Sequence, residues 1–281
     1  MINKRPYLIL SIQLIIGFFA FANLVEEDRH IAPIPTERIL EESSSMDKSN
    51  DKNWWLNSGA RVYINGNILK TLQGNLVEGD YWQSKYKNYN AEETDNGFHP
   101  QNIFRLVTKG KYNDPVQSMY FKINNYILSQ DIHRAASNGV LFFNRYQDGD
   151  NLYYVGLRVD GQAVIKKKTN GIYYTMAYKP VYFDTIYNRE SNPNLIPANT
   201  WIGIKSEISN MDNQNVLIKL FIDRTNSGNW ELITEAIDDG NKYGGKSITG
   251  SGYAGIRSDF MDVEFEEYNV IEKSEELKAQ Q

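Results

Sequence analysis

The feature that most constrains the fold is a series of apolar segments separated by short turn sequences between Gly139 and Ala177. Segments 139–147, 152–159, 162–169 and 172–177 are rich in β-branched and aromatic residues, and the turns between them contain Asp148-Gly149-Asp150-Asn151, Asp160-Gly161 and Asn170-Gly171. Asp-Gly and Asn-Gly tolerate the positive φ angles that two-residue hairpin turns require. The pattern therefore predicts an antiparallel meander whose register can be worked out from the turns.

The turn lengths assign each side chain of this meander to one face of the sheet. The expected pairs beside the loops are Gln147 with Leu152, Val159 with Gln162, and Thr169 with Ile172. Because side chains alternate along a strand, one face is predicted to be the core, with Val140, Phe142, Val155, Leu157, Val159, Val164 and Ala177. The opposite, open face is predicted to carry, among apolar neighbours, Arg145, Tyr154, Gly156, Arg158, Lys167, Tyr174 and Tyr178.

The residue types of the open face suggest a ligand-binding surface. Tyrosine rings stack on the apolar faces of sugar rings, and Arg and Lys donate hydrogen bonds to hydroxyls or pair with carboxylates. Gly156 would let a ligand approach the backbone. We therefore take these residues as candidate glycan-binding residues. The alternative is an ordinary solvated or loop-covered sheet face, because cross-strand Tyr–Lys pairs stabilise sheets without a ligand.

The composition of the whole chain excludes several classes of protein. Its 281 residues, 41% hydrophobic and 13% aromatic, can bury a sizeable core, which excludes a largely disordered protein. The net charge of −5 provides no basic field, so nucleic acid is not an expected partner. No cysteine is present, which excludes thiol chemistry and Cys-based metal sites.

The N-terminal segment, residues 1–25, has the pattern of an export signal. Lys4 and Arg5 precede an apolar run from Tyr7 to Val25, and Ala20-Phe21-Ala22 fits the small residues that signal peptidase accepts. We expect cleavage after Ala22. An uncleaved hydrophobic anchor helix is the alternative, because the run is near the lower length limit for a membrane-spanning helix. Either version places the rest of the chain outside the cell, secreted or anchored to the outer side of the cytoplasmic membrane.

The rest of the chain divides by composition. Residues 26–52 are polar and contain Pro and Ser, which predicts a flexible linker. From Trp54 onward, short apolar segments bounded by Gly, Asn, Asp and Pro predict about a dozen strands, one of them at 81–86. The helix candidate in this part is 131–137. We therefore expect an all-β sandwich over 53–271 and a charged tail over 272–281.

Several segments of the predicted sandwich resemble a known superfamily. Gly139–Asp148 followed by Asn151–Gly161 is similar to the central hairpin of concanavalin A-like (laminin-G-like) jelly-roll domains. Segments 200–207 and 218–223 resemble the next strand pair, and 252–257 with 261–265 resemble the closing strands. The resemblance covers about residues 100–272 and implies two antiparallel sheets. The superfamily includes lectins, carbohydrate-binding modules, glycoside hydrolases, polysaccharide lyases and adhesive modules, so the resemblance implies a sugar ligand on one sheet.

Catalytic candidates are weaker than the binding candidates. Asp262, Glu264 and Glu266 alternate on one strand, as paired carboxylates do in retaining glucanases of this superfamily, but the leading Glu of that pattern is absent. A charged solvent face is the alternative. His133 is the candidate for a lyase, although the spacing of Gln130 to His133 differs from the Gln-x-His pattern of alginate lyases.

A calcium site is the candidate metal site. Asp148, Asp150 and Asn151 present closely spaced oxygens in one turn, and Ca²⁺ requires several oxygen ligands. Turn chemistry explains the same residues equally well. We therefore expect no cofactor, with Ca²⁺ as the alternative.

The sequence predicts a secreted or surface-tethered module that binds a glycan or cell-surface polysaccharide through a Tyr/Arg/Lys sheet face. The alternative is a polysaccharide-degrading enzyme on the same fold, either a glycoside hydrolase or a lyase. The third hypothesis is a structural or adhesive module of an envelope. A membrane contact is expected only through an uncleaved N-terminal segment.

Overall fold

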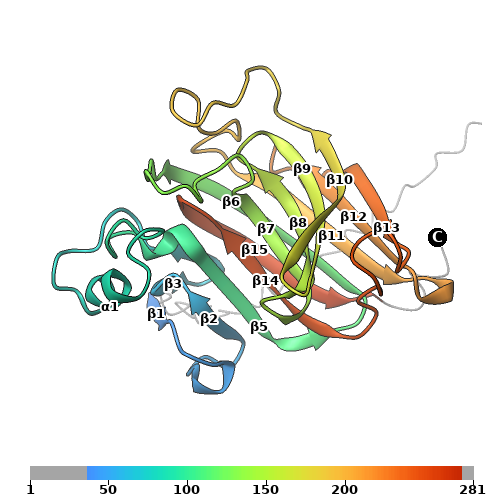
Figure 1. Cartoon of the computed structure of the whole chain (residues 1–281), viewed down its shortest axis with the longest axis horizontal. Coiled ribbons are helices and arrows are strands. Elements are labelled where there is room, and N and C mark those ends of the chain that lie inside the picture. The colour runs from blue at the N-terminus through green and yellow to red at the C-terminus, as the bar shows by residue number, and fades with distance from the viewer. Residues whose placement is uncertain (1–36, 274–281) are drawn as a thin grey trace, which may run out of the picture. The chain divides into compact units, whose positions relative to one another are not determined.

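A computed structural model describes residues 37–273 of the chain. These residues form two antiparallel sheets, of eight and seven strands, packed as a sandwich (Figure 1). The all-β, two-sheet architecture expected from the sequence is therefore confirmed. The predicted signal or anchor segment at 1–25 lies outside the described residues. Between residues 37 and 273, no helix is long and apolar enough to span a membrane.

The eight-stranded sheet contains both ends of the described chain. In spatial order its strands are β1 (Arg38–Glu41), β3 (Arg61–Asn65), β4 (Ile68–Thr71), β15 (Met261–Glu272), β6 (Pro115–Tyr126), β11 (Ile202–Asn210), β12 (Val216–Asp223) and β13 (Glu231–Asp238).

The seven-stranded sheet contains the predicted meander. In spatial order its strands are β10 (Ile172–Pro180), β9 (Gln162–Thr169), β8 (Asn151–Arg158), β7 (Gly139–Asp148), β14 (Gly252–Ser258), β5 (Phe104–Tyr112) and β2 (Trp54–Ser58).

The main core lies between the two sheets and is filled by alternate residues of their strands. Phe142 and Ile256 from one sheet and Phe121 and Phe265 from the other are fully buried there. The predicted core residues of β7 and β8 all belong to this cluster. Val164 does not, because it belongs to a cluster on the outer face of the seven-stranded sheet.

A small helical lobe adjoins β1, β2 and β3 at one end of the sandwich (Figure 1). Its helix α1 (Tyr81–Tyr89) begins after Asp80, whose side chain accepts a hydrogen bond from the Trp82 backbone N–H at 2.7 Å. Trp82 and Tyr86, four residues apart, pack on one side of the helix into a second core. The strand predicted at 81–86 is therefore wrong, because the helical spacing of these aromatics outweighs their strand propensity.

Three further segments differ from the sequence prediction. Arg38–Glu41 forms β1 and pairs with β3, and Leu40 is buried, so the fold begins near residue 37 rather than 53. Segment 131–137 is a loop rather than a helix. At the other end, β15 continues to Glu272, and residues 274–281 of the predicted tail lie outside the described residues.

The meander register is confirmed at one hairpin and shifted at another. Ile172 pairs with Thr169 across Asn170-Gly171, as predicted. Across Asp160-Gly161, however, Leu157 pairs with Ala163, so the loop contains three residues instead of two. This one-residue shift exchanges the two faces of β9.

A β-bulge in β7 produces a second difference. Beside the turn, Asp148 pairs with Asn151, which is the register that the expected Gln147–Leu152 pair implies. The register then shifts between Asn144 and Asp148, and Phe143 pairs with Tyr154. Within the bulge Arg145 has a φ of 48°, which turns its side chain away from the predicted face.

Candidate functional site

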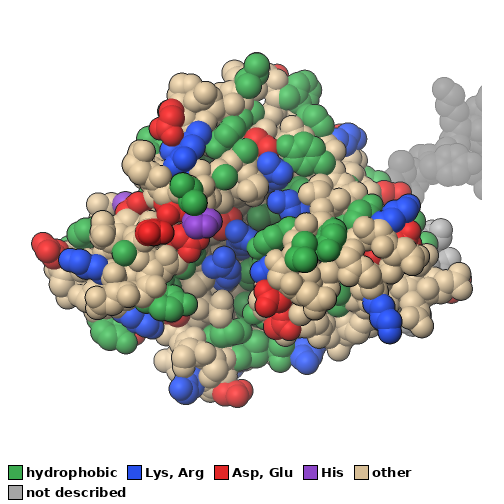
Figure 2. Space-filling view, in the orientation of Figure 1, with side chains coloured by type: hydrophobic (Ala, Val, Ile, Leu, Met, Phe, Trp, Pro, Cys, Tyr) green, Lys and Arg blue, Asp and Glu red, His purple; other side chains and the backbone are tan. Residues whose placement is uncertain are grey.

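A groove lies on the outer face of the seven-stranded sheet, opposite the face that packs into the main core. It consists of two adjoining cavities of about 570 and 430 Å³. Both cavities are lined by Arg105, Tyr154 and Tyr173. Figure 2 shows the hollow, with Lys and Arg side chains on its floor and acidic side chains and a histidine at its edge. We call the two cavities together the groove.

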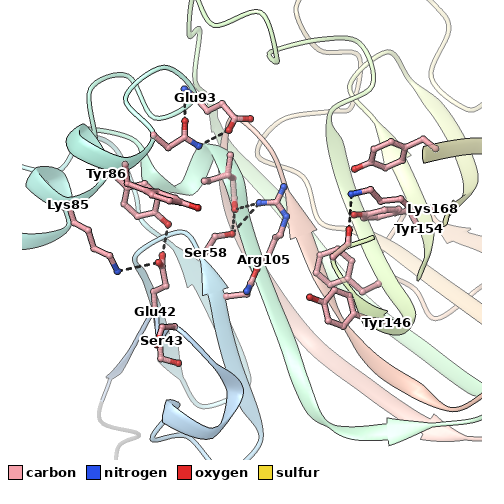
Figure 3. A pocket seen from close by; sticks show the side chains of 18 residues that line it. Glu42, Ser43, Ser58, Lys85, Tyr86, Glu93, Arg105, Tyr146, Tyr154 and Lys168 are labelled. Carbon is pink, nitrogen blue, oxygen red and sulfur yellow. Dashed lines mark hydrogen bonds and ion pairs between the residues drawn. The ribbon is translucent and has the colours of Figure 1, made fainter. Parts of the chain in front are cut away.

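One wall of the groove comes from the helical lobe and from the segment between β1 and β2 (Figure 3). The Tyr86 hydroxyl donates a hydrogen bond to the Glu42 carboxylate, and Lys85 Nζ lies 3.6 Å from the other oxygen of that carboxylate. The backbone N–H of Gly59 donates to the same hydroxyl at 3.0 Å. These contacts attach α1 to the sandwich and fix the position of the wall.

The floor contains a row of aromatic rings from neighbouring strands. Phe143 lies 5.5 Å, centroid to centroid, from both Tyr146 and Tyr154, and Tyr154 lies 5.7 Å from Tyr173. Tyr154 is buried, whereas Tyr173 is 49% exposed. The Tyr173 ring is therefore the most accessible of these rings for stacking on a ligand.

Two arginines lie opposite each other on the floor. Arg257 of β14 pairs in register with Arg105 of β5. The Arg257 Nε donates to both carboxylate oxygens of Asp259, at 2.9 and 3.0 Å, and its guanidinium lies 5.3 Å from the Tyr154 ring centroid. Arg105 donates through Nη1 only to neutral oxygens, Ser58 Oγ at 3.2 Å and the Ile103 carbonyl at 3.0 Å.

The groove carries more positive than negative side chains, although the chain as a whole is acidic. Its five cations are Lys85, Arg105, Lys166, Lys168 and Arg257, and its three carboxylates are Glu42, Glu93 and Asp259. Within residues 37–273, Arg105 and Lys166 form no ion pair with a carboxylate. The groove therefore presents unbalanced positive charge.

Two neighbouring tyrosines of the floor have pKa values shifted in opposite directions. Burial raises the pKa of Tyr154 to about 12. Burial also acts to raise the pKa of Tyr173, but the charge of Arg257 and a hydrogen bond from Tyr154 outweigh it, so the pKa of Tyr173 is lowered. Of the two tyrosines, Tyr173 therefore loses its proton first as the pH rises.

His133 lies at the edge of the groove, in the cavity that also contains Glu93. Its backbone N–H donates to Asp131 Oδ1 at 2.7 Å, and its Nδ1 lies 2.8 Å from the same oxygen and 3.8 Å from Glu93 Oε1. The His133 side chain is 58% exposed. It is the one weak catalytic candidate from the sequence that the structure places at the groove.

The other catalytic candidates lie away from the groove. Asp262, Glu264 and Glu266 alternate with core residues of β15 and so point outward from the eight-stranded sheet. Glu264 pairs with Lys122 at 3.0 Å and Lys70 at 3.2 Å. Burial acts to raise its pKa, but the hydrogen bonds from Lys122, Asn124 and Lys70 together outweigh burial and the pKa is lowered. Asp262 accepts hydrogen bonds that hold the 74–101 region against β15.

Three predicted binding residues do not lie on the open face. Arg145 and Lys167 are completely buried on the inner side of the sheet. Arg145 binds Asp114 at 2.9 Å, and Lys167 binds Asp238 at 2.9 Å. Tyr174 pairs with Lys167 and packs near Gly244, so it also lies outside the groove. The prediction that these side chains join Tyr154 on one open face is wrong, because the bulge and the shifted loop reverse their faces.

The remaining predicted binding residues lie on the outer face. Tyr154 lines both cavities. The Arg158 guanidinium lies 4.9 Å from the Tyr178 ring centroid, and Asp160 accepts hydrogen bonds from both side chains. Arg158 and Tyr178 therefore form a cluster next to the groove rather than part of its lining. A Cβ on Gly156 would collide with the Val140 carbonyl of β7, so this glycine makes room for a neighbouring strand and not for a ligand.

The candidate calcium ligands serve the turn that contains them. Asp148 Oδ1 accepts hydrogen bonds from the Asp150 N–H at 2.8 Å and from Asn151 Nδ2 at 2.9 Å. Asp150 also pairs with Lys168 at 3.2 Å. In the part of the chain that the structure describes, no group of three or more His, Asp or Glu side chains is placed to hold a metal ion. Calcium binding by this turn stays a prediction.

Sequence reasoning missed most of the groove lining. The missed residues on the sheet are Arg105, Tyr146, Lys166, Lys168, Tyr173 and Arg257. Lysines 166–168 did contain a usable signal, because strand alternation puts the outer two of three consecutive lysines on one face. The wall residues of the helical lobe had no such signal, because their contact with the sheet depends on the tertiary fold.

The two-sheet sandwich that the resemblance to concanavalin A-like domains implies is the architecture observed. No family model and no curated protein sequence matches the chain. Among solved structures, it is similar to the carbohydrate-binding module CBM66 from Bacillus subtilis, with 12% identity and a TM-score of 0.47 over 79% of this chain and 96% of that one.

Two glycoside hydrolase structures from Bacillus licheniformis are also similar. A β-glucanase has 11% identity and a TM-score of 0.40, over 85% of this chain and 98% of the other. The GH43 protein BlXynB (K247S mutant) has 11% identity and a TM-score of 0.40, over 73% of this chain and 33% of the other. Likeness at this level carries no argument about function, so function depends on the groove itself.

Proposed function

We propose that this protein binds a carbohydrate chain in the groove on the outer face of the seven-stranded sheet. The observation that supports this function best is the aromatic row of the floor, with the half-exposed Tyr173 beside Arg105 and Lys166. Tyrosine rings offer apolar surface for sugar rings, and the cations supply hydrogen-bond donors for sugar oxygens. The groove also has the concave form and mixed lining typical of ligand sites.

The N-terminal sequence adds a location to this proposal. The basic and apolar pattern of residues 1–25 supports export, with the sandwich secreted or held at the outer side of the cytoplasmic membrane. There the sandwich would meet extracellular or cell-surface polysaccharides. Protease treatment of intact cells tests this location: the sandwich should be accessible, and full protection inside intact cells would contradict it.

Binding is tested with the purified chain and a panel of immobilised polysaccharides, both neutral and acidic. At least one polymer should retain the protein, and Tyr173→Ala should weaken that binding roughly tenfold, or about 1.4 kcal/mol. Tyr81→Ala is the matched control, because Tyr81 is also an exposed tyrosine but lies outside the groove lining. Failure of every polymer to bind would favour the structural or adhesive hypothesis instead.

Cleavage of the bound polysaccharide in the same groove is the second candidate function. The specific observation is the lowered pKa of Tyr173 beside the raised pKa of Tyr154. A Tyr173 phenolate could remove the proton next to a sugar carboxylate. The C–H electron pair would then form a C=C bond, and the glycosidic bond would break toward its oxygen, which takes up a proton. Ultraviolet absorbance of an unsaturated product that disappears in Tyr173→Phe would support this activity, and no such product from any acidic polymer would exclude it.

A further inference from the structure

Uncompensated positive charge is concentrated at one place on the groove floor. Arg105 and Arg257 lie opposite each other on adjacent strands, and Lys166 lies in the same cavity. Asp259 forms its ion pair with Arg257, and its charge only partly offsets that of Lys166. Within residues 37–273, the Arg105 guanidinium has only neutral acceptors, and the Lys166 ammonium has neither a hydrogen bond nor an ion pair.

This arrangement costs stability unless another group compensates it. Lys166 is partly buried, and burial is the largest cause of its lowered pKa, followed by the charges of Arg158 and Arg257. Asp259, an acidic residue in the same cavity, already accepts both hydrogen bonds from Arg257 Nε. An anion bound beside these cations would offset the repulsion between Lys166 and Arg257 and would give Arg105 a charged partner.

We propose that Arg105, Lys166 and Arg257 form a binding site for an acidic group, a carboxylate or a sulfate, on a sugar residue of the ligand. This inference rests on the proposed carbohydrate-binding function and names its ligand class as acidic polysaccharide. Arg105 donates only through Nη1, and Arg257 donates through Nε to Asp259 and also hydrogen-bonds Tyr173, so the remaining guanidinium N–H groups can bind the acidic group. Tyr154, stacked under Arg257, and Tyr173 give the same sugar residue an apolar surface.

The test compares polymers that differ only in their acidic groups. One pair is a polyuronate and the same polymer with its carboxyl groups reduced to hydroxymethyl groups. The second pair is a sulfated glucan and the unsulfated glucan. At about 0.1 M salt, at least one acidic polymer should bind tenfold or more tightly than its neutral partner. The pair that shows this preference identifies the acidic group.

Substitutions in the groove test whether these residues produce the preference for the acidic polymer. Lys166→Met and Arg105→Met should each reduce the preference about tenfold, because each variant weakens binding of the acidic polymer more than binding of its neutral partner. Lys166→Met removes no side-chain hydrogen bond from the described fold, so it remains informative if Arg105→Met does not fold. Lys219→Met is the charge-matched control, because Lys219 lies on β12 in the other sheet.

The possible outcomes separate this inference from the proposed function. Equal affinity for acidic and neutral partners overturns the inference and leaves carbohydrate binding intact. Absence of binding to all four polymers and to the wider panel overturns carbohydrate binding itself. A preference that survives in both groove variants, or that is lost equally in Lys219→Met, shows that the acidic group is bound elsewhere and also overturns the inference.

Discussion

The two faces of the seven-stranded sheet hold positive charge in opposite ways. On the inner face, Lys167 is fully buried and binds Asp238 together with the backbone carbonyls of Gly245 and Lys246. On the outer face, the ammonium of its neighbour Lys166 has no partner within residues 37–273. Two adjacent lysines of β9 thus carry the same charge in different environments. Within residues 37–273, the ammonium of Lys167 is fully paired, whereas that of Lys166 has no partner.

This difference separates structural cations from those available to a ligand. A buried cation has to be fully paired, because removing it from water costs several kcal/mol. Arg145 meets the same requirement, with four hydrogen bonds that connect β7 to residues 113, 114, 210 and 248. A partly buried cation without such partners gains nothing for the fold, and under the proposed function it is available to a ligand.

The largest expected effect comes from removing Lys167, the paired cation of the inner face. Lys167→Met leaves the Asp238 carboxylate buried without its cation, so we expect a loss of about 3–5 kcal/mol of unfolding free energy. The melting temperature should fall by roughly 10 °C. Denaturant and thermal unfolding measure the loss.

A second substitution distinguishes the buried charge from lost packing. Lys167→Met combined with Asp238→Asn leaves no unpaired buried charge and should recover about half of the loss. Tyr153 can still donate its hydrogen bond to the side-chain oxygen of the new amide, as it does to the Asp238 carboxylate at 2.6 Å. If Lys167→Met alone had the stability of the wild type but bound ligand poorly, the assignment of Lys167 to the fold would be contradicted.

A smaller effect is expected from removing one hydroxyl on either face of β8. The Tyr153 hydroxyl is buried between Asp238 and the Ile248 N–H, so Tyr153→Phe should cost about 1–3 kcal/mol of stability and leave groove binding unchanged. Tyr154→Phe makes the same chemical change on the groove side and should weaken binding without that loss. Parallel unfolding and binding measurements on the two variants check the contrast. The same profile for both would show that the faces are not functionally distinct.

The sequence was sufficient for the two-sheet architecture because the signals that specify it are local. Strand periodicity and turn dipeptides act over a few residues, and they predicted the sandwich and the register across Asn170-Gly171. The core positions of β7 and β8 follow from the same alternation. Those residues needed no information from distant parts of the chain.

The sheet face on which each site residue lies was predicted less well, because it depends on contacts between distant parts of the chain. At Asp160-Gly161 the carbonyl of Gly161 accepts hydrogen bonds from Val181 and Tyr182, about 20 residues away, and these support the three-residue loop. The bulge at Arg145 is held by Asn113 and Asp114 from another part of the chain. A one-residue error at such a point exchanges the two faces of a strand, which is why Arg145 and Lys167 were predicted as binding residues and Lys166 was not.

The smallest predicted effect tests whether the unpaired charge of Lys166 on the outer face lowers the stability of the fold. Lys166 has a pKa below its ordinary value of 10.5, chiefly because of burial, so the folded state binds its proton less tightly than the unfolded state does. Its charged form therefore lowers stability below the folded pKa, and this penalty disappears as the pH rises through that pKa toward 10.5.

Lys166→Met should accordingly raise the melting temperature at neutral pH by about 2 °C, or roughly 0.5–1 kcal/mol, because the site is partly solvated. The gain should shrink as the pH rises toward 10.5, because the folded wild-type amine then loses its charge. Thermal unfolding of both proteins between neutral and alkaline pH measures this difference. A variant less stable than the wild type at neutral pH would mean that Lys166 supports the fold as Lys167 does, and the contrast between the two faces would then no longer separate structure from binding.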